Sequence, residues 1–193
     1  FLLPRLMPGL REAFPRLRLW LREDMTDRLI EALDAGRLDL LLLALPCDCG
    51  DIESVTIAED PFHLAMPPGH PLAALPDIPP TALAGQRLML LEEGHCLREH
   101  AASACGLPGA AASEEFAATS LHTLVQMVGG GLGLTLLPNL AVAGGITAGA
   151  NVATRPLTGA FGRRIALAWR ARSPRAEEFR ALVPTIAAAL HGS

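Results

Sequence analysis

Lysine and tyrosine are both absent from the 193 residues, so all 16 residues in the Lys and Arg count are arginines. Without lysine the chain has no P-loop nucleotide site and no Schiff-base nucleophile, and without tyrosine it has no phenolic general acid. Candidates for chemistry are therefore limited to cysteine, histidine, serine or threonine, the carboxylates and arginine.

Long apolar runs and an excess of positive charge are also missing. The longest apolar run, residues 38–46, is far shorter than the roughly 20 residues that a membrane span needs. The first residues lack the order of charged, apolar and small segments that marks a signal peptide. A net charge of -4 makes the chain a poor nucleic-acid binder, so any DNA contact would come from a segment outside this sequence. We interpret it as the middle of a longer cytoplasmic chain.

Cysteines are few, and their spacing excludes two common uses. Cys47, Cys49, Cys96 and Cys105 are too few for a disulfide-stapled secreted domain of this length. Their C-x-C and C-x8-C spacings do not match the paired C-x2-C ligands of zinc sites. The sequence therefore predicts free thiols. For Cys47 and Cys49, which lie in a predicted turn, we favour two spectator thiols over a second thiol switch or a soft-metal site.

Apolar periodicity predicts an α/β chain from its first 45 residues onward. Helical spacing covers 4–14, and leucines alternate with arginines over 16–22 as in a half-buried strand. A helix capped by Thr26 runs to about residue 35, where Gly36 fits a left-handed C-cap, and a continuous apolar strand follows over 38–44. This order of helix, strand, helix, strand favours a parallel sheet.

The remaining segments repeat the α/β pattern. We expect strands at 52–59, 62–66, 87–91 and 165–169, helices at 96–105 and 120–128, and a last helix opened by Ser173 that Pro184 kinks or interrupts. Two small sheets with a cleft between them are the predicted architecture. Ligand sites in such folds lie at the carboxyl ends of strands and at helix N-termini.

The most informative segment is residues 90–100, where a strand ends, Gly94 turns the chain and Cys96 begins a helix. A helix N-terminus carries partial positive charge and unpaired N–H groups, which favour a thiolate. His95 and Arg98 add possible donors or positive charge. Thiolate is the species that attacks peroxide, so Cys96 is the candidate oxidant-sensitive sulfur.

Cys105 lies nine residues after Cys96, at a spacing that a helix cannot bridge. In one helix the two residues are about 13 Å apart along the axis and on opposite faces. A disulfide needs Cα atoms at roughly 4.4–6.8 Å. The bond would therefore require the helix to unwind, which would turn oxidation into a conformational signal. The alternative interpretation is that Cys105 is a small buried apolar residue near a helix end.

Three segments resemble the hydrogen-peroxide sensors among the LysR-type transcriptional regulators. They are residues 91–98 together with Cys105, which lies nine residues after Cys96, then residues 118–124, and residues 131–138. Residues 2–4 and 33–39 look like the effector-binding half of the same family, so the resemblance covers essentially the whole chain. The Gly-His-Cys-Leu-Arg core with its second cysteine is specific, whereas 131–138 is shared by LysR-type proteins generally.

The resemblance implies an architecture like that of periplasmic binding proteins. It implies two Rossmann-like subdomains with a central cleft, residues 1–63 plus 166–193 and residues 64–165, with a redox loop at 92–106. The two crossover strands would lie near His63–Pro67 and Arg164–Ala168. An N-terminal winged helix-turn-helix would precede this sequence and is absent from it.

The resemblance also implies a mechanism and partners. Cys96 would be the peroxidatic cysteine and Cys105 the resolving one, with Thr26, His95, Arg164 and Arg98 around the peroxide. From the residues alone, Thr26 reads as a helix cap and Arg164 as one of two solvated arginines with Arg163. The partners would be hydrogen peroxide, further copies in a homodimer or homotetramer, promoter DNA through the absent domain, RNA polymerase, and a reductant such as glutaredoxin or thioredoxin. We expect no metal, cofactor or membrane, and a regulator rather than an enzyme.

Two other functions remain open on the sequence. One is a LysR-type domain that binds a small organic inducer in the cleft, which calorimetry with peroxide-inert metabolites would test. The other is a stand-alone thiol peroxidase, which would turn over peroxide at the expense of a thiol reductant. A sensor would instead react stoichiometrically.

Overall fold

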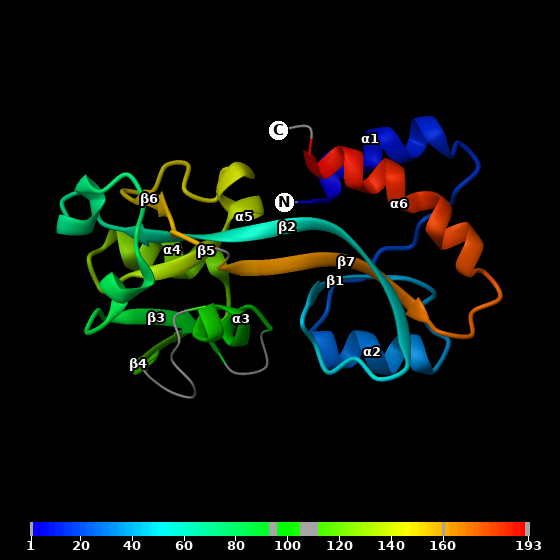
Figure 1. The fold of residues 1–193 in the computed structure, drawn as a ribbon, viewed down its shortest axis with the longest axis horizontal. Helices are drawn as coiled ribbons and strands as arrows, with labels where there is room; N and C mark the ends of the chain where they lie inside the picture. Colours follow the sequence, from blue (N-terminus) through cyan, green and yellow to red (C-terminus); the bar gives the residue numbers. More distant parts are fainter. Residues whose placement is uncertain (1, 93–95, 105–111, 160, 192–193) are drawn as a thin grey trace. The chain divides into compact units, whose positions relative to one another are not determined.

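The computed structural model describes residues 2–92, 96–104, 112–159 and 161–191 (Figure 1). The chain divides into two compact units, residues 1–59 with 164–193 (unit 1) and residues 60–163 (unit 2). Two strands, β2 (Ile52–Met66) and β7 (Gly162–Arg170), contribute residues to both units. The subdomain boundaries expected from the sequence, at 63/64 and 165/166, stay a prediction. Within the described residues, no helix is both long and apolar enough to span a membrane.

Unit 1 combines elements from both ends of the chain. Its helices are α1 (Leu3–Ala13), α2 (Thr26–Asp34) and α6 (Ala176–His191), and its first strand is β1 (Leu41–Leu45). β7 lies between β1 and β2 in the sheet, and α1 packs against α6 (Figure 1). The core beneath α2 joins its buried Leu33 to β1 and β7.

Two expectations for unit 1 are wrong. No strand forms at 16–22, where Trp20 is 93% exposed, because alternation alone supplies no partner strand. The first sheet is not parallel: β1 pairs antiparallel with β7, which comes from the other end of the chain and so is invisible to local element order. Of the two outcomes expected at Pro184, the interruption does not occur, since α6 continues through this residue, and the kink stays a prediction.

Unit 2 contains the rest of that five-stranded sheet, a separate two-stranded sheet and most of the short elements. β2 pairs antiparallel with β5 (Thr135–Pro138) and β6 (Ala153–Pro156), and β3 (Leu88–Leu91) pairs parallel with β4 (Ala112–Ala118). The helices are α3 (Cys96–Ala104), α4 (Leu121–Gly129) and α5 (Asn139–Ala143), with 3-10 turns at Pro71–Ala74 and Pro80–Leu83. The main core buries apolar side chains of β2, β3 and β5.

β2 is one strand of 15 residues, which corrects the two separate strands expected at 52–59 and 62–66. Pro61 has no backbone N–H to donate. Its position in β2 is exposed, and the missing hydrogen bond does not end the strand. The next N–H, that of Phe62, donates to the carbonyl of Phe161 at 3.0 Å, so pairing continues past the proline.

A buried carboxylate lies where β2 meets the start of β7. Asp60 is fully buried, and its Oδ2 accepts from Nε of Arg163 at 2.9 Å. Its Oδ1 accepts from the backbone N–H of Leu140 at 2.9 Å, near the start of α5. Both carboxylate oxygens are therefore satisfied inside the unit, as a buried charge requires.

Gly162 stands at the same place because no side chain fits there. A Cβ on Gly162 would lie 2.7 Å from the carbonyl oxygen of Asp60 and 2.7 Å from Cα of Pro61. Both obstacles are backbone atoms, so they cannot rotate out of the way. The close approach of β2 and β7 thus depends on a glycine.

Gly162→Ala is expected to lower the free energy of unfolding by about 1–3 kcal/mol, because the two strands must separate locally to admit the methyl group. Urea denaturation followed by circular dichroism measures the change. Gly69→Ala is the matched control, since an added Cβ there meets nothing within 4 Å. Equal losses for the two variants would contradict the packing argument.

His63, three residues after Asp60, gives the fold a dependence on pH. Burial lowers the pKa of His63, and a hydrogen bond with Asn139 and the charge of Asp60 only partly oppose this. The folded chain therefore resists protonation that the unfolded chain accepts near pH 6.5. Stability from the neutral imidazole is fully present above that pH and is lost as pH falls through the unfolded pKa toward the folded one.

We expect the free energy of unfolding to fall between pH 7.5 and pH 5, and to fall less in His63→Gln. Urea denaturation at a series of pH values measures both slopes. Carboxylates contribute to the parent slope, so the difference between variants is the informative quantity. Gln126→Ala, at an exposed position without a titrating side chain, is the control and should keep the parent slope. A slope in His63→Gln equal to that of the parent would rule out His63 as a source of the pH dependence of stability.

Candidate functional site

Cys96 is the first residue of α3, as the sequence predicts. Its thiol is free and its side chain is half-buried, so the sulfur is sheltered yet within reach of a small reagent. α3 packs against β3, the strand that ends a few residues earlier at Leu91. Cys96 therefore lies at the end of α3 that carries the partial positive charge of the helix.

Arg98 holds the start of α3 to the end of β3. Its Nη1 donates to the carbonyl oxygen of Leu91, the last residue of β3, at 2.9 Å. A charge-assisted bond of this kind is stronger than a neutral one. The observed contact of Arg98 is therefore with backbone, and it positions the helix that begins at Cys96.

Arg98→Ala is expected to speed hydrogen exchange of the α3 amides by about tenfold, since a lost charged hydrogen bond is worth about 1.5 kcal/mol in a half-buried place. Amides of β5 should be unaffected. Exchange followed by mass spectrometry measures both segments. Glu99→Ala, at the exposed neighbouring position, is the control. Unchanged α3 exchange in Arg98→Ala would show that the bond does not hold the helix.

A small cavity lies beneath α3. Its volume is about 10 Å³, room for about one water molecule, and its walls come from β3, α3, α4 and β5. The lining is apolar except for Arg98 and Thr135, and the Thr135 hydroxyl already donates to the carbonyl of Met89 at 2.7 Å. The packing between α3 and the strands beneath it therefore leaves a small space, although Leu97 and Ala101 still pack into the core.

The other predicted site residues are distributed over both units. Thr26 and Arg164 belong to unit 1, while Cys96 and Arg98 belong to unit 2. Thr26 is half-buried at the start of α2, but the expected side-chain cap is absent there. Arg164 is exposed on β7. His95 and Cys105 lie outside the described residues.

Two features of the site escaped the sequence analysis. His100 is 7% exposed and lies one helical turn after Cys96, so the two share a face of α3. The i, i+4 spacing was available in the sequence and could have identified it. Arg163 was expected to be a solvated arginine. It is instead paired with buried Asp60.

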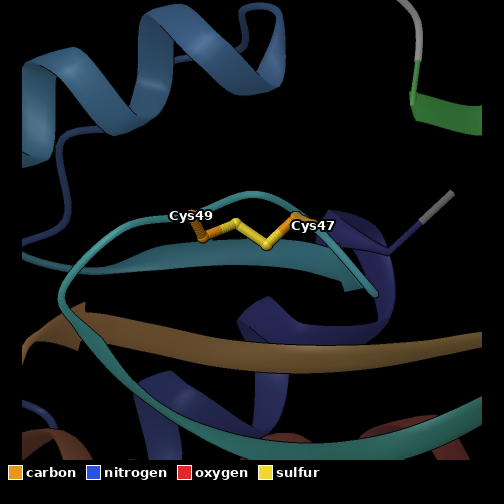
Figure 2. Close-up of a disulfide and its surroundings, with 2 residues drawn as sticks. All are labelled: Cys47 and Cys49. Carbon is orange, nitrogen blue, oxygen red and sulfur yellow. A yellow bond between two sulfur atoms is a disulfide. The ribbon is translucent and has the colours of Figure 1, made fainter.

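The expectation for Cys47 and Cys49 was also wrong. They are not spectator thiols: their sulfurs form a disulfide in the loop between β1 and β2, with Cα atoms 5.3 Å apart (Figure 2). Cys49 is buried and Cys47 half-buried. Unit 1 therefore contains a disulfide, and unit 2 contains the free thiol of Cys96.

Comparison with known proteins places these features in a family. The LysR substrate binding domain matches residues 1–190. A probable hydrogen peroxide-inducible genes activator of Mycobacterium avium is 41% identical over 194 residues, covering 96% of this chain and 60% of that protein. The chain therefore spans about 60% of that relative's length.

Two solved structures are similar in fold and in sequence. The reduced regulatory domain of OxyR2 from Vibrio vulnificus is 39% identical with a TM-score of 0.88, covering 98% of this chain and 89% of that one. A cysteine mutant of OxyR from Corynebacterium glutamicum, in its hydrogen-peroxide-bound form, is 29% identical with a TM-score of 0.91, covering 99% and 61%.

Proposed function

This chain belongs to the LysR substrate binding domain family, and we propose that it is the hydrogen-peroxide-sensing part of a transcription regulator. The observation that carries the proposal is the free, half-buried Cys96 at the first position of α3. The similarity to a peroxide-inducible genes activator and to OxyR regulatory domains supports it. The peroxide-bound relative indicates that this fold accommodates the proposed ligand.

The first chemical step forms a sulfenic acid at Cys96. The thiolate attacks one peroxide oxygen, the O–O bond breaks, and the leaving hydroxide takes a proton to become water. The N-terminus of α3 stabilises the attacking anion. In this proposal Thr26, His95, Arg164 and Arg98 surround the peroxide. Arg98 also fixes the helix start through Leu91.

The second step joins Cys96 to Cys105 and releases a second water. From Cys96 to Ala104 the chain is one helix, a rise of about 12 Å. A disulfide needs Cα atoms at roughly 4.4–6.8 Å, so the bond cannot form while α3 is intact. Condensation therefore unwinds α3, withdraws Leu97 and Ala101 from the core, and breaks the Arg98 bond to Leu91.

Unwinding of α3 would be the signal that the rest of the regulator transmits. In the whole protein, a homodimer or homotetramer would change its arrangement on promoter DNA, bound through a winged helix-turn-helix outside this sequence, and alter contacts with RNA polymerase. A cytoplasmic reductant such as glutaredoxin or thioredoxin would reset the disulfide. The reaction consumes one peroxide per chain and then stops until the disulfide is reset, whereas a peroxidase turns over continuously with its thiol reductant.

The test is to treat the reduced 193-residue chain with one equivalent of hydrogen peroxide, alkylate it and map the thiols by mass spectrometry. We expect loss of alkylation at Cys96 and Cys105 together, a cross-linked peptide containing both, and reduced helical dichroism. Oxidation of Cys96 to sulfenic acid with Cys105 still alkylated would refute the intramolecular switch. Catalytic peroxide consumption with a thiol reductant would favour the peroxidase.

A further inference from the structure

The loop between β1 and β2 contains a disulfide, Cys47–Cys49, that the peroxide mechanism does not use (Figure 2). We propose that this pair is a second redox site, which exchanges electrons with neutral or cationic small thiols through Cys47. The site lies in unit 1, whereas Cys96 lies in unit 2. The proposed exchange uses neither Cys96 nor Cys105.

The disulfide contributes little to holding the fold together. It closes a loop with one intervening residue, Asp48, and the chain-entropy gain of a cross-link is smallest for the shortest loops. The strands on either side of the loop are already held, because β7 pairs with both. A reduced cysteine packs as a small apolar side chain, so Cys49 can stay in its place. The pair can thus open and close within the folded chain.

The two sulfurs differ in accessibility, which decides where a thiol attacks. Cys49 is 5% exposed and packs against a core that includes Leu33 of α2 and Leu41 of β1. Cys47 is half-buried at the edge of the same core. Exchange requires a thiolate to reach the attacked sulfur. Cys47 is therefore the attacked atom and Cys49 the leaving group.

The exchange transfers two electrons in two steps. A thiolate forms a bond to Sγ of Cys47, the Cys47–Cys49 bond breaks, and Cys49 leaves as a thiolate that takes a proton from water. A second thiolate attacks the small-molecule sulfur of the mixed disulfide and releases Cys47, which is protonated in turn. The pair is reduced, and two thiols are oxidised to one disulfide. A small disulfide reverses both steps.

The loop's own charged side chains select among thiols. Residues 46–53 contain Asp48, Asp51 and Glu53 and no basic side chain. Glu53 is paired with Arg180 of α6, but Asp48 and Asp51 are exposed. Their negative charge repels an anionic thiolate reagent and attracts one that carries an ammonium group, an effect that salt screens.

The test uses the 193-residue chain with Cys96→Ser and Cys105→Ser, so that only this pair can react. Differential alkylation and mass spectrometry follow the reduction in native buffer. We expect neither cysteine to be alkylated in the chain isolated without reductant, and both to be alkylated after treatment with 2-mercaptoethanol. The two reagents have different thiol pKa values, so each rate is divided by the concentration of its thiolate before comparison. On that basis cysteamine should react several-fold faster than 3-mercaptopropionate, and Asp48→Asn should bring the two rate constants closer together.

Single substitutions identify the attacked sulfur. In the same background, Cys49→Ser should capture cystamine as a mixed disulfide at Cys47 about tenfold faster than Cys47→Ser captures it at Cys49. Equal or reversed rates would overturn the assignment. Two free thiols that cystamine does not oxidise, or a disulfide reducible only in denaturing urea, would overturn the site itself. Because Cys96 and Cys105 are absent, neither result depends on the peroxide reaction.

Discussion

Cys96→Ser is expected to react with hydrogen peroxide at least about a hundredfold more slowly than the parent chain. A serine hydroxyl is not ionised near neutral pH and is a weak nucleophile without an adjacent base, whereas a thiolate attacks peroxide directly. The half-buried place of Cys96 at the start of α3 shelters its side chain and does not block a molecule as small as peroxide. Stopped-flow measurement of peroxide consumption gives the rate constants.

Cys105→Ser separates the two chemical steps. This variant should keep the first rate constant within about threefold and stop at a sulfenic acid on Cys96, which a cyclic 1,3-dione traps. Its helical dichroism should not change on oxidation, because α3 has no reason to unwind. The control is Cys47→Ser with Cys49→Ser, which should react like the parent. A parent-like rate in Cys96→Ser would place the peroxide reaction elsewhere.

Asp60→Ala is expected to lower the free energy of unfolding by about 3–4 kcal/mol. The change removes the partner of Arg163. The guanidinium of Arg163 is then an unpaired charge on a side chain that is only 17% exposed. Breaking one half of a buried pair costs this much because the remaining charge is uncompensated. It also removes the acceptor for the Leu140 N–H at the start of α5.

A set of substitutions separates charge from hydrogen bonding at this pair. Asp60→Asn keeps an acceptor for Leu140 and should lose less than Asp60→Ala. The double change Asp60→Leu with Arg163→Met removes both charges and should recover most of the loss. Glu59→Ala, at the exposed neighbouring position, is the control and should change stability little. Urea denaturation measures all four. A double variant no more stable than Asp60→Ala would contradict the electrostatic explanation.

Local features of the fold were predictable where one residue determines them. Gly36 adopts a φ of 72° after α2, as a left-handed C-cap requires, and the Ser120 hydroxyl accepts from the Thr123 N–H at the start of α4. The start of α3 at Cys96 was also predicted. Each of these follows from neighbours a few residues apart.

Features that depend on distant partners could not be predicted. The leucines of 16–22 alternate as in a strand, yet a strand needs a neighbour that the sequence pattern does not specify. β1 finds its partner in β7, far along the chain. Arg163 pairs with Asp60 because β2 and β7 meet, and no local pattern distinguishes it from exposed Arg164. Cys47 and Cys49 bond because their loop turns both sulfurs toward each other.

The pairing of α1 with α6 has a consequence for synthesis on the ribosome. The helix translated first in this sequence packs against the helix translated last, while residues 60–163 form a unit from one uninterrupted stretch. Unit 2, with its Cys96 helix, can therefore fold during translation, whereas α1 must wait for α6. A released chain truncated after residue 163 should already protect unit 2 from protease and leave α1 open to cleavage.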